Sequence, residues 1–403
     1  MRKSQKPQKP TKPQEHTEAK RNLRLVAFES IITAGLLSMP IMSPFFLSLG
    51  LSQSQIALSQ VIFTVVIMLF GLPAGWIADR FSRKWANVIG DFGIFITLLL
   101  YSQVQGFAGI VIAEIAFGIF LSFSQGVDAS LLKHFSGQID PSGKHFQTTQ
   151  ARVSSLQFIF SLILVLLGGP IGAISFRLAI ALSSLGNLAG GIAALFIKDD
   201  SEKLIPEHQN PLKDMVRVTK SAVKDPQLRL RLFAYAITRE VTHGIIWVFT
   251  PLLLLAGVPL SIVSVGWVFN YLACLIGSEL ARAYATRFKA WQVVALPMAL
   301  AAISTGVMSL HFSLTTVWLY LIMGVVQGWS KATMTPLVLK DTTPSEQNSI
   351  LALAATISRL LYVPSVWLIG LAADIKLEYS LLATFAIFIP LAIPVLLKLR
   401  KEK

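Results

Sequence analysis

Long apolar runs separated by short polar stretches occupy most of this chain, and they restrict the folds that it can adopt. A helix needs about 20 predominantly apolar residues to cross a bilayer, and the runs reach that length repeatedly. Charged residues make up 14% of the chain, whereas soluble domains carry about 25%. The sequence therefore predicts an all-α membrane protein that crosses the bilayer many times.

Twelve runs are predicted to be transmembrane helices. They cover residues 23–48, 54–78, 85–104, 107–133, 148–169, 174–197, 228–256, 260–285, 291–310, 314–339, 345–370 and 376–397. They group into an N-terminal bundle of six helices (23–197) and a C-terminal bundle of six (228–398), joined by a polar linker (198–227). Residues 1–22, rich in Lys, Pro, Gln and Glu, are expected to form a disordered tail, and 399–403 form a second short tail.

The distribution of Lys and Arg predicts the orientation in the membrane. Cytoplasmic loops of membrane proteins carry an excess of these residues. Here basic loops alternate with loops that hold almost no cations, Arg177 and Lys376 being the main exceptions. Both termini share the basic side, as an even number of spans requires, so we expect them in the cytoplasm. Orientation explains the net charge of +14, and no nucleic-acid partner is expected.

The most distinctive motif is the short charged turn Gly75–Lys84, between the second and third predicted spans. Its charged residues are Asp79, Arg80, Arg83 and Lys84. Charges cannot stay in the hydrocarbon, so this turn must lie at a water interface. It resembles the loop signature Gly-x-x-x-Asp-Arg-x-Gly-Arg-Lys of the major facilitator superfamily, with Ser82 in place of the usual second Gly. A weak internal repeat agrees, since the spacing of Pro44 and Gly50 recurs at Pro251 and Gly257.

This resemblance implies two pseudo-symmetric six-helix bundles around one midplane cavity, which opens alternately to either side. It implies that the first, fourth, seventh and tenth spans line the cavity, and that the protein works as a monomer. It also implies a lock in the outward-open form. In that lock Asp128 would contact Arg83, and Asp79 would contact the cytoplasmic start of the eleventh helix.

Ionisable side chains inside predicted spans are costly, so each one is a candidate for function. The set comprises Glu29, Glu114, Arg239, Glu240, His243, Lys331 and Arg359. Glu240 and His243 lie three residues apart near the middle of the seventh span, hence on one helical face. A carboxylate at that depth can carry a proton, which His243 would relay or tune. The alternative is a neutralised Arg239–Glu240 pair that only stabilises helix packing.

The remaining candidates have two interpretations each. Glu114 stands four residues before Gly118, where drug-exporting members of the resembling family commonly carry Arg; it would titrate or pair helices. Glu29 lies about two turns into the first span and is either part of the site or interfacial. Lys331 and Arg359 each need a carboxylate, a carbonyl or an anionic substrate nearby. Lys331 is a candidate for selecting acidic groups on a ligand, and Arg359 for pairing with another helix.

The predicted function is a proton-coupled secondary transporter that exports small amphiphilic molecules across a bacterial inner membrane. Its expected partners are the substrate, protons and the lipid bilayer. Three alternatives stay open: an exporter of a dedicated metabolite such as a siderophore, an importer of a sugar or peptide-like solute, and a non-transporting membrane sensor. Gly168–Ala173 partly resembles the Gly-Pro-x-x-Gly-Gly signature of antiporters, and it fits a hinge that breaks the fifth span equally well.

Enzyme chemistry and bound cofactors are not expected. The chain has no Gly-x-x-x-x-Gly-Lys-Ser/Thr phosphate loop for ATP. The single cysteine, Cys274, cannot build a disulfide framework or a cysteine-based metal site. The six histidines form no catalytic set with a nucleophile or metal ligands.

Overall fold

The computed structural model describes residues 13–198, 225–342 and 347–401, and every element assigned in these ranges is a helix. The first half contains α1 (Pro13–Ile32), η1 (Met39–Ile41), α2 (Met42–Ser48), α3 (Gln53–Arg80), α4 (Arg83–Tyr101), α5 (Gly106–Ser124), α6 (Val127–Ile139), α7 (Lys144–Ile174) and α8 (Phe176–Leu195). The second half contains α10 (Pro226–His243), α11 (Ile246–Leu255), η3 (Leu260–Ile262), α12 (Val263–Tyr284), η4 (Ala285–Arg287), α13 (Ala290–Leu310), η5 (Thr316–Tyr320), α14 (Leu321–Leu339), α15 (Gln347–Ile375) and α16 (Tyr379–Lys401).

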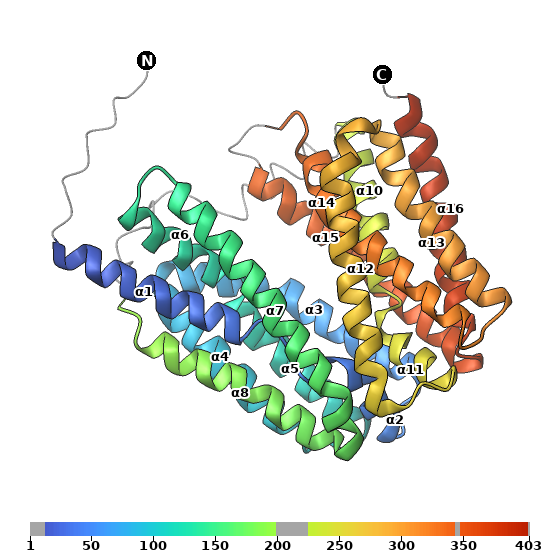
Figure 1. The fold of residues 1–403 in the computed structure, drawn as a ribbon, viewed down its shortest axis with the longest axis horizontal. Coiled ribbons are helices and arrows are strands. Elements are labelled where there is room, and N and C mark those ends of the chain that lie inside the picture. Colours follow the sequence, from blue (N-terminus) through green and yellow to red (C-terminus); the bar gives the residue numbers. More distant parts are fainter. Residues whose placement is uncertain (1–12, 199–224, 343–346, 402–403) are drawn as a thin grey trace.

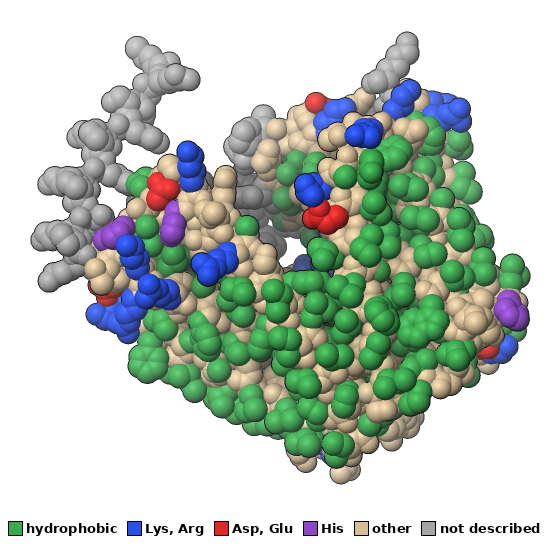
Figure 2. Space-filling view, viewed as in Figure 1, with side chains coloured by type: hydrophobic (Ala, Val, Ile, Leu, Met, Phe, Trp, Pro, Cys, Tyr) green, Lys and Arg blue, Asp and Glu red, His purple; other side chains and the backbone are tan. Residues whose placement is uncertain are grey.

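The two halves form two arms of a V (Figure 1). The arms meet at the end where α2 and α11 lie, and they separate toward the end that carries the start of α1 and the end of α16. Within the first arm α4 packs against α5 and α8, and within the second α12 packs against α14 and α13 against α16. The arms touch through α3 with α15 and α7 with α12. Figure 2 shows a hollow between the arms at their open end.

Nine of the described helical stretches are long and apolar enough to cross a membrane. The three other predicted crossings are α1 with α2, α10 with α11, and η5 with α14. They are broken into shorter helices or carry many polar residues, as in the segment Arg239–His243 of α10 and at Lys331 of α14. The least apolar crossings are thus the first, seventh and tenth, which are among those expected to face the cavity.

Hydrogen bonds between the two arms hold the closed end together. The Ser43 hydroxyl donates to the Trp247 carbonyl oxygen over 2.6 Å, and the Thr250 hydroxyl donates to the Pro40 carbonyl oxygen over 2.7 Å. Each bond joins the broken first crossing to α11. We refer to these contacts, with the hydrogen bond from the Gly169 N–H to the Ser264 hydroxyl (2.5 Å), as the closed-end clasp.

Several predicted spans are broken where the sequence suggested one continuous helix. The first ends at Ile32 and resumes as η1 and α2, with Pro40 and Pro44 in the new segments. The fourth breaks before α6 at Gly126, whose φ of +83° is left-handed. The expected hinge at Gly168–Ala173 is not a break, because α7 continues through it. Gly168 and Gly169 instead allow close approach of η1 and α12.

The predicted first tail is wrong in its second half, because α1 already begins at Pro13. Ala19 is buried there, and the Asn22 side chain exchanges two hydrogen bonds with the backbone of Lys198 (2.7 and 3.2 Å). The predicted second tail likewise continues α16 to Lys401. Residues 1–12, most of the predicted linker (199–224) and residues 402–403 lie outside the described residues.

The internal repeat seen in the sequence has a structural counterpart. Gly50 follows α2 and Gly257 follows α11, and their φ angles of +83° and +91° are both left-handed. A residue in this conformation just beyond a helix end satisfies the last carbonyls and is usually glycine. The two halves therefore end equivalent helices in the same way.

Candidate functional site

A polar cavity of about 170 Å³ lies between α10 and α14. We call it the α10–α14 pocket; its lining residues are Tyr235, Arg239, Thr242, His243, Gln327, Ser330, Lys331, Met334 and Thr335. Helical spacing explains this set, because residues three and four apart share a face. α11 follows α10 in the same crossing and contacts α2 and α3. The seventh crossing therefore adjoins the first half.

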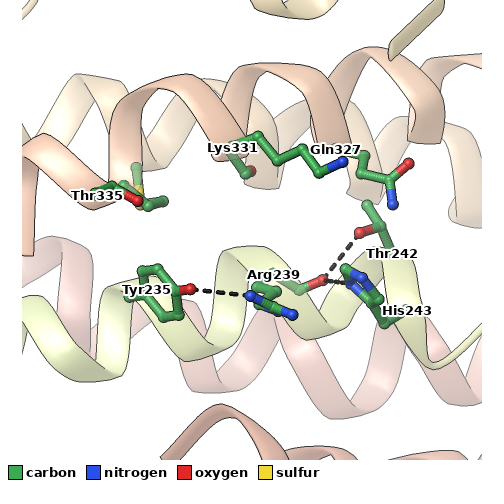
Figure 3. A pocket seen from close by; sticks show the side chains of 9 residues that line it. Tyr235, Arg239, Thr242, His243, Gln327, Lys331 and Thr335 are labelled. Carbon is green, nitrogen blue, oxygen red and sulfur yellow. Dashed lines mark hydrogen bonds between the residues drawn. The ribbon is translucent and has the colours of Figure 1, made fainter. Parts of the chain in front are cut away.

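The α10 side of the pocket is organised around Arg239. Its guanidinium donates to the Tyr235 hydroxyl one turn earlier (2.9 Å), and its carbonyl oxygen is 2.8 Å from Nδ1 of His243 one turn later. The Thr242 hydroxyl donates to the same carbonyl oxygen. Figure 3 shows Lys331 on the opposite wall, with its side chain running along α14 toward Gln327. Two cations and several neutral donors therefore face one small volume.

Glu240 is not part of that lining, although it follows Arg239 directly. Its side chain is buried and accepts a hydrogen bond from the Ser358 hydroxyl of α15. The Arg239 Nε atom lies 3.5 Å from its carboxylate, and Arg359 interacts with it electrostatically. His243 lines the pocket, whereas Glu240, three residues earlier on α10, points to Ser358 of α15, and the expected proton relay between them stays a prediction. The alternative pairing of Arg239 with Glu240 is present.

Arg359 also belongs to this group of charges. It lies on α15 beside Ser358 and interacts electrostatically with both Arg239 and Glu240. Lys331 is exposed to the cavity, and its charge acts on His243. Two cations, Arg239 and Arg359, thus act on the Glu240 carboxylate, and Lys331 adds a third positive charge beside His243, so the local balance is positive.

Glu114 is a buried carboxyl group of the first half. It lies on α5 and accepts a hydrogen bond from the Gln60 amide of α3 (2.5 Å). Tyr362 of α15, whose hydroxyl accepts from the Trp247 indole (3.2 Å), interacts electrostatically with both Glu114 and Glu240. Tyr362 thus interacts electrostatically with one buried carboxyl group in each half. The sequence did not predict this arrangement.

Glu29 lies away from the α10–α14 pocket, in a buried acidic cluster of the first half. Its carboxyl group is within hydrogen-bonding range of Asp91 on α4 and Asp128 on α6. Asp128 also accepts a hydrogen bond from the Asn87 amide (2.9 Å). The cluster shows no metal-binding geometry: among the described residues, no three His, Cys, Asp or Glu side chains are arranged to hold an ion. Glu29 is buried within the first half, with an exposed fraction of 1%.

The charged turn of the sequence joins α3 and α4 with only Phe81 and Ser82 between them. Ser82 caps α4 by accepting a hydrogen bond from the Trp85 N–H (3.3 Å). Its φ of −175° is extended backbone, so serine replaces the usual glycine without strain. Arg80 stacks over Trp76 and Lys84 over Trp85.

The gating role of this turn stays a prediction. Gly75 faces open space, with no atom near the position of an added Cβ. The Asp79 side chain and residues 343–346 before α15 lie outside the described residues. Asp128 accepts a hydrogen bond from the Asn87 amide, and its expected contact with Arg83 stays a prediction.

Residues 25–365 of the chain match the Major Facilitator Superfamily. No curated protein matches the chain by sequence. Solved structures resemble it closely in fold. They include the nucleoside transporter NupG (TM-score 0.76, 11% identity, covering 96% of this chain and 100% of that one). A bacterial homologue of the human lysosomal transporter Spinster, inward-facing and unoccupied, gives a TM-score of 0.72 at 15% identity, covering 97% and 98%. A D-xylose–proton symporter gives 0.65 at 13%, covering 94% and 96%.

Proposed function

Because this chain belongs to the Major Facilitator Superfamily, we propose that it is a proton-coupled secondary active transporter that exports small organic molecules by alternating access. The superfamily and the twelve-helix fold expected from the sequence are confirmed, and the protein is a transporter rather than an enzyme. Coupling ion, direction, bacterial inner-membrane location and the monomeric state belong to the proposal. The observation that carries it is the buried Glu240 carboxyl group beside the α10–α14 pocket, next to Arg239, which lines that pocket.

The distribution of cations supports an inward-open state. The end at which the arms separate carries the basic segments, including Lys144, Arg287 and the last turn of α16. The closed end carries few cations, Arg177 and Lys376 among them. By the positive-inside rule the open end faces the cytoplasm. An exporter loads its substrate from this side, so the open cavity is the loading state that export requires.

Two carboxyl groups are suited to carry the proton. Glu240 and Glu114 are buried, and a neutral, protonated carboxyl group is compatible with that environment. On release of the proton, Glu240 has Ser358, Arg239 and Arg359 to stabilise its charge. Arg239 also lines the pocket, so a change in the protonation state of Glu240 changes the charge balance of a residue that would contact the substrate. A shared arginine thus links proton and substrate.

The closed-end clasp supports alternating access. Its hydrogen bonds join groups from different halves, so they can form only while that end is shut. An outward-open state must break them and close the other end instead, where the charged turn Gly75–Lys84 lies.

Everted membrane vesicles from producing cells test the proposal. Respiration acidifies their lumen, and addition of a transported compound should release protons, seen as dequenching of a pH-sensitive dye. The variant Glu240→Gln should abolish this response. A matched control is Glu279→Gln, because Glu279 is exposed and pairs only with Arg282 one turn away. Proton movement that survives in Glu240→Gln would refute the assignment of Glu240, and solute that leaves the lumen together with the protons would refute export.

A further inference from the structure

We propose that the α10–α14 pocket binds an oxyanion of its solute, so that the transported compounds are organic acids: carboxylates or phosphate esters. This inference rests on the proposed transport function and specifies its substrate class. Two observations support it. Cationic side chains and hydrogen-bond donors face the pocket, and the Glu240 carboxylate points away from it.

The pocket holds cationic groups without equivalent acidic partners. Lys331 is exposed to the cavity, and no described residue forms an ion pair or hydrogen bond with its ammonium group. Arg239 is 46% exposed and shares Glu240 with Arg359. Arg239 and Lys331 line the pocket and Arg359 lies beside Glu240, so this group of charges holds three cations and one carboxylate, a surplus of two positive charges. Such a surplus inside a membrane protein is costly unless an anion compensates for it.

The remaining groups of the lining complete an anion site. None of the nine described side chains that line the pocket is acidic. Glu240, the nearest carboxylate, is held against α15 by Ser358 and therefore does not occupy the pocket. The Gln327 amide can donate hydrogen bonds to an oxyanion, whereas the Thr242 and Ser330 hydroxyls already donate to the carbonyl oxygens of Arg239 and Thr238. A cationic solute would meet like charges, with no carboxylate on the pocket surface to offset them.

The size of the pocket restricts what it binds. About 170 Å³ suits a carboxylate or phosphate group with a few attached atoms. The rest of a larger solute would extend into the hollow between the arms, which is open in this state (Figure 2). Phe249 and Trp267 are buried and pack against each other, and neither lines the pocket.

A thiol-modification experiment measures the charge of the pocket without knowledge of the substrate. In a Cys274→Ala background, Thr335→Cys places a thiol on the pocket wall one turn from Lys331, and Thr315→Cys places one on an exposed loop as the matched control. The probes are methanethiosulfonate reagents that carry either a sulfonate or a trimethylammonium group. Their rates of reaction are compared on the detergent-purified protein.

The expected result is a preference for the sulfonate reagent at position 335 and not at position 315. Removing one charge about 6 Å away, with the dielectric constant of water, changes the ratio of the two rates about tenfold. Lys331→Gln should therefore lower the sulfonate preference at position 335 by about tenfold or more. A faster reaction with the cationic reagent, or a ratio that Lys331→Gln leaves unchanged, would overturn the proposal.

A second experiment tests the solute itself. Mass spectrometry compares the solutes retained by a deletion strain with those retained after complementation by the wild type or by Lys331→Gln. The solutes that accumulate without the protein should carry a net negative charge at pH 7, and Lys331→Gln should fail to restore their export. Accumulation of neutral or cationic solutes, or full complementation by Lys331→Gln, would overturn the proposal. Loss of the proton response in vesicles is a separate readout, which bears on the transport function.

Discussion

The closed-end clasp makes a quantitative prediction about the conformational equilibrium. The double variant Ser43→Ala and Ser264→Ala removes two hydrogen bonds between the halves, to the Trp247 carbonyl oxygen and from the Gly169 N–H. An average intramolecular hydrogen bond contributes about 1 kcal/mol net. Both bonds exist only while this end is closed, so their loss costs the closed-end state about 2 kcal/mol. The ratio of inward-open to outward-open molecules should therefore fall about thirtyfold.

Pulsed electron paramagnetic resonance can measure this shift. Spin labels at Ser48, at the end of α2, and Thr315, before η5, report the separation of the two halves at the closed end in a Cys274→Ala background. The variant should gain a population at longer distance. The matched control is Ser122→Ala with Ser309→Ala, because each of these hydroxyls donates only to a carbonyl oxygen of its own helix (2.7 and 2.8 Å).

Two results would refute this reasoning. If the double variant kept the distance distribution of the wild type, the clasp would contribute nothing to the equilibrium. If the control pair shifted the distribution equally, the effect would reflect a general loss of helix stability. Thermal unfolding of both double variants separates these cases. A clasp effect changes the distance distribution of the clasp variant alone, whereas a general loss of helix stability lowers the melting temperature of both variants.

Two further predictions concern stability and pH. Gly328→Ala should destabilise the protein by about 1–3 kcal/mol, because its Cβ would lie 1.8 Å from the Cys274 carbonyl oxygen; thermal unfolding checks this against Gly71→Ala, where the added carbon meets open space, and equal stability of the two variants would contradict it. In the loop before α7, the Ser142 hydroxyl and N–H hold the pKa of Asp140 below its usual range. The charged carboxylate therefore stabilises this turn above the ordinary aspartate pKa, and the contribution is lost as the pH falls through the lowered value. Asp140→Asn should speed hydrogen exchange of residues 142–147 at pH 7, and an unchanged exchange rate would contradict the assignment.

Local sequence patterns were sufficient to predict the fold. Apolar length, the charged turn Gly75–Lys84 and the alternation of basic loops each concern neighbouring residues, and they act through the cost of placing charge in lipid. The repeat of Pro44 and Gly50 at Pro251 and Gly257 also has a structural counterpart, because Gly50 and Gly257 both adopt left-handed φ angles. Helix ends were predicted less well. α1 extends back to Pro13 because Asn22 bonds to the backbone of Lys198, a residue distant in the sequence.

The depth of a residue along its helix was not sufficient to predict which residues form the site. Counting residues placed Glu29, Glu114, Glu240 and Lys331 inside the bilayer, but a helix can present any of its sides to a neighbour. Packing decided that Glu240 turns to Ser358 and that Glu29 joins Asp91 and Asp128. Neither partnership has a signature at a fixed spacing, since each joins separate helices.

The residues alone therefore specify a bilayer-spanning bundle pair, its polar candidates and, through Lys and Arg, an expected orientation, because transfer of charge into lipid depends on each residue's own chemistry. The tertiary structure assigns partners: Lys331 faces Arg239 across one pocket, Glu240 is held outside it by Ser358, and Tyr362 accepts a hydrogen bond from Trp247. Those choices depend on the rotation of each helix about its axis, which is set by contacts between helices that lie far apart along the chain.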